Sequence, residues 1–142
     1  MSNKSKGSNM ERELVKLFAA NGWRAARVAG SGVGDEAPCD IIAGKMGRRG
    51  YVVEVKSSRK NAIYIKKSQI EDFMKFSEMI SVKPVLAVRF LREGWLFVDL
   101  KHLKDTGKFW AISIDTAKER GKRFSQYFDE GTAEKESAYF YE

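Results

Sequence analysis

Two apolar segments on either side of a glycine- and arginine-rich turn constrain this fold more than any other feature. The segments are residues 40–43 (Asp-Ile-Ile-Ala) and residues 51–56 (Tyr-Val-Val-Glu-Val-Lys), and residues 44–50 join them. Short apolar segments that flank a glycine-containing turn are typical of a β-hairpin. Side chains alternate between the two faces of a strand, so Glu54 and Lys56 point the same way. The hairpin therefore places an acid at the start of one strand and an acid and a lysine together on the next.

Asp40, Glu54 and Lys56 are the residue types of a metal-dependent nuclease site. Two carboxylates can hold a hard divalent cation through oxygen ligands. A lysine beside them can orient a water molecule or stabilise the charge that develops on a phosphate. An amphipathic hairpin with a solvated glutamate and lysine is the alternative that these residues leave open, because short motifs often match by chance.

The charge of the chain favours a polyanionic partner. The formal net charge is +7 and the pI is about 9.5, which suits a nucleic-acid-binding domain, although it also serves solubility. Basic residues form three clusters, at Lys45, Arg48 and Arg49, at Arg59 and Lys60, and at Lys66 and Lys67. We expect all three clusters to border the acidic site and to hold a DNA backbone there.

The composition excludes several classes of site. Cys39 is the only cysteine, so an intrachain disulfide is impossible and an intracellular, cytoplasmic location is expected. His102 is the only histidine, which argues against histidine-ligated zinc and against a Ser-His-Asp triad. No apolar segment approaches the ~20 residues of a membrane helix, so no membrane partner is expected.

Helical periodicity in the first part of the chain predicts a helix over 9–21, with Asn9 as its N-cap. Within it, Glu11 shares the apolar stripe and so lies at the edge of the buried face. A strand is predicted over 23–29, followed by a mobile glycine-rich loop over 30–39 that ends against the acidic site.

The second part of the chain alternates helices and strands. The pattern from Ser68 to Glu71 is a capping box and predicts a helix that begins after Ser68. Gln69 lies in its first turn and is expected to be solvated. Strands are predicted at 84–90 and 94–100, then a short strand at 109–114 and a helix at 116–128.

This order of elements predicts one α/β domain, a mixed central sheet flanked by helices. The expected divisions are a flexible basic N-terminus at 1–8, the domain itself at 9–128, and a loose acidic tail at 129–142.

In this order and spacing, Glu11, the loop from Gly30 to Gly34, Asp40 and the pair Glu54 and Lys56 resemble the PD-(D/E)xK nuclease superfamily. The similarity is greater to the archaeal-type Holliday junction resolvases and runs from about residue 6 to residue 100. The matching segments are 10–14, 27–31, 40–44, 53–56, 84–88 and 94–95. One departure is Cys39, which precedes the aspartate where the superfamily pattern has proline.

The resemblance implies a restriction-endonuclease-like fold and a site that uses Mg²⁺, with Mn²⁺ as a substitute. It implies that Asp40 and Glu54 are metal ligands, that Glu11 is an essential acid able to hold a second ion, and that Lys56 is catalytic. It further implies that Arg12 and Arg27 contact DNA, and that Ser31 both contacts DNA and belongs to the catalytic site. The implied partners are four-way junction DNA and a second copy of the chain, since a homodimer makes two symmetry-related cuts.

Two other functions remain open from the sequence. One is a nuclease of the same fold, for restriction or repair, without junction specificity. The other is a non-catalytic DNA-binding domain, but such a domain would be expected to lose one of Asp40, Glu54 and Lys56, and all three are present. The expected dimer surface is late aromatic material, namely Trp95, Phe97, Phe109 and Trp110, with burial in the core of a single chain as the alternative.

Overall fold

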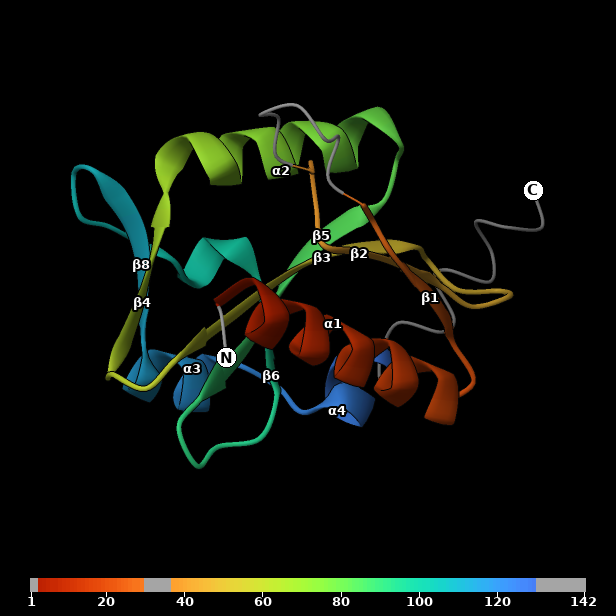
Figure 1. The fold of residues 1–142 in the computed structure, drawn as a ribbon. Helices are drawn as coiled ribbons and strands as arrows, with labels where there is room; N and C mark the ends of the chain where they lie inside the picture. The colour runs from red at the N-terminus through yellow and green to blue at the C-terminus, as the bar shows by residue number, and fades with distance from the viewer. Residues whose placement is uncertain (1–2, 30–36, 130–142) are drawn as a thin grey trace.

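The computed structural model describes residues 3–29 and 37–129, and a five-stranded sheet forms its centre (Figure 1). The strand order is β1-β2-β3-β5-β6. Only the β3–β5 pair is parallel, and the other neighbours are antiparallel. The mixed α/β sheet predicted from the sequence is thus confirmed. The strands are β1 Arg24–Arg27, β2 Ile41–Gly44, β3 Tyr51–Ser58, β5 Lys83–Phe90 and β6 Leu96–Val98.

Helices cover both faces of this sheet because its buried strands are apolar on both sides. Figure 1 shows α1 (Asn3–Ala20) and α2 (Lys67–Met79) on opposite sides. On β3, Val53 packs with the apolar residues of α1, whereas Val52 packs with those of α2. The alternation of a strand therefore sends Glu54 and Lys56 to the α2 side, together with Val52.

A second, three-stranded sheet has the order β4-β8-β7 and lies beside the N-terminal end of α2 (Figure 1). Its strands are β4 (Ala62–Lys66), β8 (Phe109–Ser113) and β7 (Lys104–Asp105). The strand predicted at 109–114 is confirmed, but β4 and β7 were not predicted. A short 3-10 helix, η1 (Leu100–His102), connects β6 to this sheet.

The helix predicted at 116–128 is wrong as a single element. The chain forms α3 (Ile114–Arg120) and α4 (Phe124–Phe128) instead. A Cβ atom at Gly121 would collide with the carbonyl oxygen of Ala117, so the chain leaves the helix where only glycine fits. Lys122 then pairs with Phe97 of β6 as an isolated bridge, which redirects the chain and brings α4 onto the sheet.

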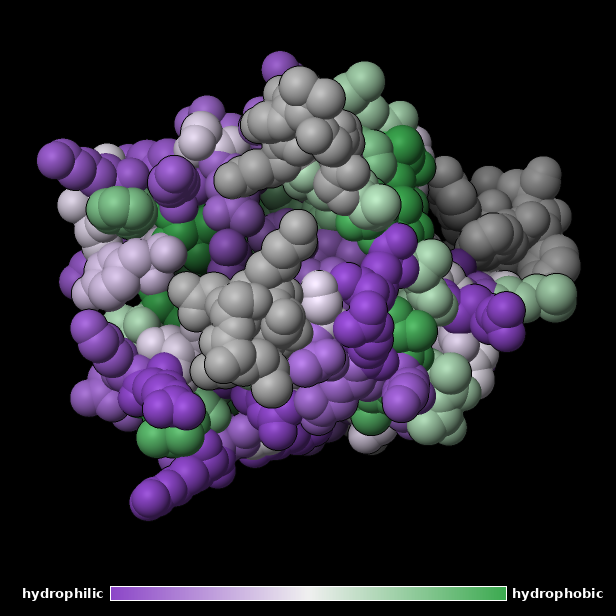
Figure 2. Space-filling view, in the orientation of Figure 1, coloured by the Kyte–Doolittle hydropathy of each residue, from purple (hydrophilic) through white to green (hydrophobic). Residues whose placement is uncertain are grey.

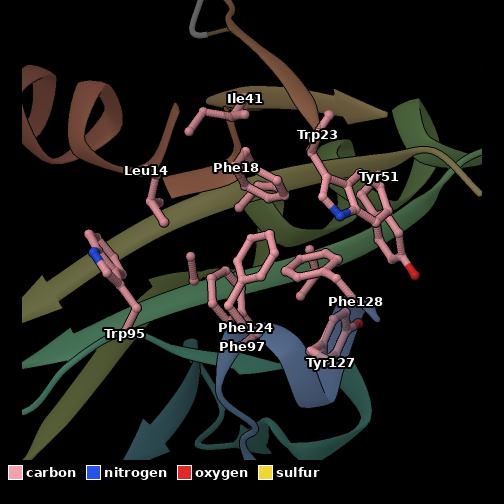
Figure 3. Packing of buried hydrophobic residues seen from close by; sticks show 14 residues of the cluster. Leu14, Phe18, Trp23, Ile41, Tyr51, Trp95, Phe97, Phe124, Tyr127 and Phe128 are labelled. Atoms are coloured by element: carbon pink, nitrogen blue, oxygen red, sulfur yellow. The ribbon is translucent and has the colours of Figure 1, made fainter. Parts of the chain in front are cut away.

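Aromatic rings fill the core between α1, α4 and the sheet (Figure 3). Phe128 is fully buried, and its ring packs against Phe18, Tyr51 and Phe97 with centroid distances of 5.1, 4.9 and 5.0 Å. Trp95 also lies in this cluster. The expected dimer surface is therefore wrong for Trp95 and Phe97, which close the core of a single chain.

The predicted helix starts also differ from the structure. The first helix begins at Asn3, so Asn9 lies inside it and does not cap it. Residue 66, not Ser68, is the N-cap of α2, and no side-chain hydrogen bond caps this helix. Residues 30–36 of the glycine-rich loop predicted at 30–39, which include Ser31, and the predicted tail beyond Asp129 lie outside the described residues. None of the described helices is both long and apolar enough to cross a membrane.

Candidate active site

The site begins where the β2–β3 ladder ends. The strand β2 starts at Ile41, whereas β3 continues to Ser58. The Asp40 amide donates to the Val53 carbonyl over 3.1 Å, and the Val55 amide then donates to Asp40 Oδ2 over 2.8 Å. The carboxylate of Asp40 thus takes over as acceptor for an amide that has lost its strand partner. This hydrogen bond fixes Asp40 against β3, one residue from Glu54.

Glu54, Lys56 and Gln69 form a second group of linked side chains. Glu54 is only 2% exposed, and its Oε2 accepts a hydrogen bond from Gln69 Nε2 over 2.8 Å. Lys56 Nζ donates to Gln69 Oε1 over 3.3 Å and lies 3.9 Å from Glu54 Oε2. The predicted same-face placement of Glu54 and Lys56 is confirmed. The expectation that Gln69 is solvated is wrong, because its amide bridges these two residues.

Burial and mutual repulsion make both carboxyl groups reluctant to ionise. Burial raises the pKa of Glu54 to about 8, and the negative charge of Asp40 adds to the shift, although Lys56 and Gln69 oppose it. Burial also raises the pKa of Asp40, while the Val55 amide opposes that shift. A buried carboxylate beside a second, partly buried one is stable only if a proton or a cation compensates their charge.

Glu11 supplies a third negative charge near this pair. It projects from α1, is partly buried as predicted, and its Oε1 lies 3.2 Å from Arg27 Nε on β1. Its charge raises the pKa of both Asp40 and Glu54. Glu13, two residues further along α1, instead faces solvent and pairs with Arg89. Arg12 is exposed next to Glu11 in the sequence, and its guanidinium donates to Asn9 Oδ1 of the same helix over 3.4 Å.

The donor chemistry of the site fits a hard divalent cation. No three Asp, Glu, His or Cys side chains within residues 3–29 and 37–129 form a closed set of metal ligands. Asp40 and Glu54 each have one oxygen held by an N–H donor, so the second oxygen of each is the one suited to ligation. Mg²⁺ is usually held by one or two carboxylates and completes its shell with water and substrate phosphates. Cys39 is fully buried beside them, and burial raises the pKa of its thiol to about 12, which makes it a packing residue.

Two of the three predicted basic clusters lie on elements of the site. Arg59 and Lys60 are exposed just past the end of β3. Lys66 and Lys67 join β4 to α2, three residues or fewer before Gln69, and Lys67 forms an ion pair with Asp105 over 2.6 Å.

The third cluster does not border the site, contrary to the expectation. The turn that carries Lys45, Arg48 and Arg49 closes the hairpin next to the Ala43–Tyr51 pair, whereas Asp40 lies at the other end of β2. At about 3.3 Å per residue the two ends are on the order of 10 Å apart. Arg48 instead donates to the Phe128 carbonyl over 3.1 Å, and Lys45 lies over the Trp23 ring.

Comparison with known proteins places this arrangement in a family. A family model described as archaeal Holliday junction resolvase (hjc) matches residues 2–135. The chain is 32% identical over 135 residues to the crossover junction endodeoxyribonuclease Hjc of Archaeoglobus fulgidus, which covers 89% of this chain and 98% of that protein. It is 41% identical over 108 residues to the Hjc of Methanocaldococcus jannaschii, which covers 75% of each chain.

The fold agrees with these sequence matches. The crystal structure of Archaeoglobus fulgidus Hjc, described as a Holliday junction resolvase from an archaeal hyperthermophile, superimposes with a TM-score of 0.76 at 28% identity. The superposition covers 86% of this chain and 94% of that structure. A match along nearly the whole chain, a shared fold and a carboxylate pair beside a lysine on the central sheet agree with one another: the chain belongs to the archaeal Holliday junction resolvase family.

Proposed function

We propose that this protein is a metal-dependent endodeoxyribonuclease that resolves four-way DNA junctions, with Asp40, Glu54 and Lys56 at its catalytic centre. The observation that carries the proposal is the buried carboxylate of Glu54, with the partly buried carboxylate of Asp40 and Lys56 beside it, in a chain of this family. The position of the two carboxylates supports it, because a buried carboxylate next to a second one costs stability unless a ligand uses it.

Each side chain has a role that follows from its contacts. Asp40 and Glu54 would hold Mg²⁺, or Mn²⁺ in its place, and the bound cation would stabilise charge on the scissile phosphate. Lys56, which Gln69 Oε1 holds in place, is suited to orient the attacking water or to compensate the charge of the leaving oxygen. Gln69 is a positioning residue, because it acts through Glu54 and Lys56. Glu11 keeps Arg27 beside the site, and Arg27 and Arg12 would contact phosphates.

The direct test compares two DNA substrates with the same arm sequences, a four-way junction and a linear duplex. We expect Mg²⁺ or Mn²⁺ to support paired cuts in the junction, little cutting of the duplex, and no cutting in EDTA. Equal cleavage of both substrates would favour the alternative, a nuclease of this fold without junction specificity. Cleavage in EDTA would contradict the metal centre.

The proposed assembly is a homodimer, because the described part of one chain holds one such carboxylate site and paired cuts on opposed strands need two. The structure offers a surface for it that the sequence did not predict. On the α2 side of the sheet, β2 leaves Ile42 37% exposed, and Met79 and Ile80 at the end of α2 are 77% and 41% exposed. Figure 2 shows a hydrophobic area around this end of α2. Apolar residues gathered in this way are typical of a protein contact.

Replacement of Ile80 with lysine should therefore convert the homodimer into a monomer. A lysine in an apolar two-fold contact would face its own symmetry mate and bury an unpaired charge. Sedimentation at micromolar concentration measures the change. Leu91→Lys, at a residue that is 55% exposed in the turn after β5, is the matched control and should remain dimeric. A dimeric Ile80→Lys variant would place the interface elsewhere.

Junction binding should weaken steeply with salt, and Arg59 and Lys60 should account for part of the slope. Both are exposed in the turn just past β3, the strand that carries Glu54 and Lys56, where they can neutralise backbone phosphates. The double replacement with glutamine should lower the slope of log K against log salt by about two units, since each phosphate contact contributes about 0.9. Lys45→Gln, at the far end of the hairpin, should leave the slope almost unchanged. An unchanged slope in the double variant would remove these residues from the DNA surface.

A further inference from the structure

The outer face of the three-stranded sheet combines exposed aromatic rings with lysines. Tyr64 on β4 is 61% exposed and Phe109 on β8 is 36% exposed. Their rings pack edge to face with centroids 6.2 Å apart. The alternate β4 residues, Ile63 and Ile65, are buried in the core, so Tyr64 owes its exposure to strand alternation and not to poor packing.

The strand register places lysines on the same face. Tyr64 pairs with Ala111, which pairs on its other side with Lys104 of β7, and in the next row Lys66 pairs with Phe109. Paired residues of antiparallel strands share a face, so Lys104 and Lys66 flank the rings, and both are exposed. None of the β4, β8 and β7 residues that these rows place on this face is acidic. Asp105 points to the other face, where it pairs with Lys67.

This lysine–aromatic face, formed by Tyr64, Lys66, Lys104 and Phe109, is connected to the proposed active site through the junction of β4 and α2. Lys66 is the N-cap of α2, and Gln69 in the first turn of α2 contacts Glu54 and Lys56. Figure 1 shows β4 running directly into the start of α2. In the space-filling view, the side of the molecule that carries β4 and β8 is mostly hydrophilic with small hydrophobic areas (Figure 2).

We propose that the lysine–aromatic face stacks unpaired DNA bases and holds the phosphates that flank them. Exposed rings between cations are the two components of a platform for single-stranded DNA. Charge argues against a second copy as the occupant, because a two-fold contact would set this lysine-bearing face against itself. The inference deepens the proposed function and rests on it. In a four-way junction, the bases beside the branch point are the ones that can unpair and expose a face for stacking.

The test uses DNA that carries 2-aminopurine, whose fluorescence falls when the base stacks on an aromatic ring. One probe is a short single strand, and the other is a four-way junction labelled beside the branch point. Both are titrated in EDTA at low salt, so binding is read without cleavage. The variants are Tyr64→Leu, which removes the ring, Tyr64→Phe, which keeps it, and Phe109→Leu and Lys104→Gln as independent probes of the same face.

We expect wild type and Tyr64→Phe to quench both probes. Tyr64→Leu should bind about tenfold more weakly, or roughly 1.4 kcal/mol, within the range for one stacked base. Phe109→Leu and Lys104→Gln should weaken binding in the same direction.

Four results would overturn the inference: absence of quenching by wild type, wild-type binding in Tyr64→Leu, equal weakening in Tyr64→Leu and Tyr64→Phe, or loss of the oligomeric state in Tyr64→Leu. The last would identify the face as a protein contact. A wild-type protein that quenches the single strand in EDTA but fails to cut the junction would instead contradict the proposed function and leave the stacking face supported.

Discussion

Replacement of Glu54 with glutamine should abolish junction cleavage, by roughly a thousandfold or more, and leave junction binding within about tenfold. A Lewis-acidic cation contributes several kcal/mol to phosphodiester hydrolysis, and about 4 kcal/mol corresponds to a thousandfold in rate. Glutamine keeps the shape of the side chain and an oxygen that accepts from Gln69 Nε2, so the loss follows from the missing charge. Asp40→Asn should behave in the same way, because asparagine still accepts from the Val55 amide.

Glu54→Gln should not destabilise the fold, and this separates a catalytic role of Glu54 from a structural role. Without a cation, folded Glu54 holds its proton up to a pKa of about 8, whereas the unfolded chain releases it near 4.5. Wild type in EDTA should therefore lose stability as the pH rises from about 4.5 to about 8. Glu54→Gln has no such proton to release, so its decline should be smaller, with the remaining part coming from Asp40, whose pKa burial also raises. Mg²⁺ should raise the stability of wild type and not that of the variant.

Urea unfolding at several pH values, together with single-turnover cleavage and binding in EDTA, measures all three effects. The matched control is Glu13→Gln, two residues after Glu11 on the solvent side of α1, where the carboxylate forms an ion pair with Arg89. It should leave cleavage unchanged. Full activity of Glu54→Gln, or an unchanged pH profile of stability, would mean that Glu54 is not the buried metal ligand.

The carboxylate pair could be predicted from the sequence because its geometry is local. Strand alternation alone places Glu54 and Lys56 on one face, and the short hairpin brings Asp40 opposite them. The contact of Gln69 depends instead on where α2 packs across β3, which no local pattern encodes. A glutamine in the first turn of a helix has no sequence feature that separates a solvated residue from one that bridges two site residues.

Long-range pairing explains most of what the sequence did not show. In β4, the apolar Ile63 and Ile65 alternate with polar or exposed neighbours. Its partner β8 lies about 47 residues further along the chain, and a short apolar segment does not specify its partner. In the sequence, the helix break at Gly121 is indicated only by the low helix propensity of glycine. Its cause is tertiary, because Lys122 pairs with Phe97.

The predicted N-caps were wrong for a different physical reason. Asn9 and Ser68 are good N-caps by residue type, yet both lie within helices that begin earlier. The helix α2 begins at Lys67, one residue before Ser68, whereas α1 runs through Lys4, Lys6 and even Gly7 before it reaches Asn9. A cap preference of about 1 kcal/mol therefore does not fix where either helix begins.

Replacement of Phe128 with alanine should destabilise the protein by about 3–5 kcal/mol, a large part of the 5–15 kcal/mol typical of a domain. Phe128 is fully buried, and its ring contacts rings from α1, β3 and β6. A residue from the last described helix thus joins elements that are distant in sequence, including the strand that carries Glu54 and Lys56. The cavity left by alanine would remove contacts that neighbouring rings are too rigid to replace.

Urea unfolding of Phe128→Ala measures this effect, and the mechanism predicts a split between stability and chemistry. The ring packs on the α1 side of the sheet, whereas Glu54, Lys56 and Gln69 lie on the α2 side. Well below its lowered unfolding temperature, the variant should therefore keep its rate of junction cleavage. Phe109→Ala, which removes the same ring from an exposed position, should cost about 1 kcal/mol or less. Equal destabilisation by the two substitutions would show that α4 does not close the core. The region after residue 101 would then stabilise the fold in some other way.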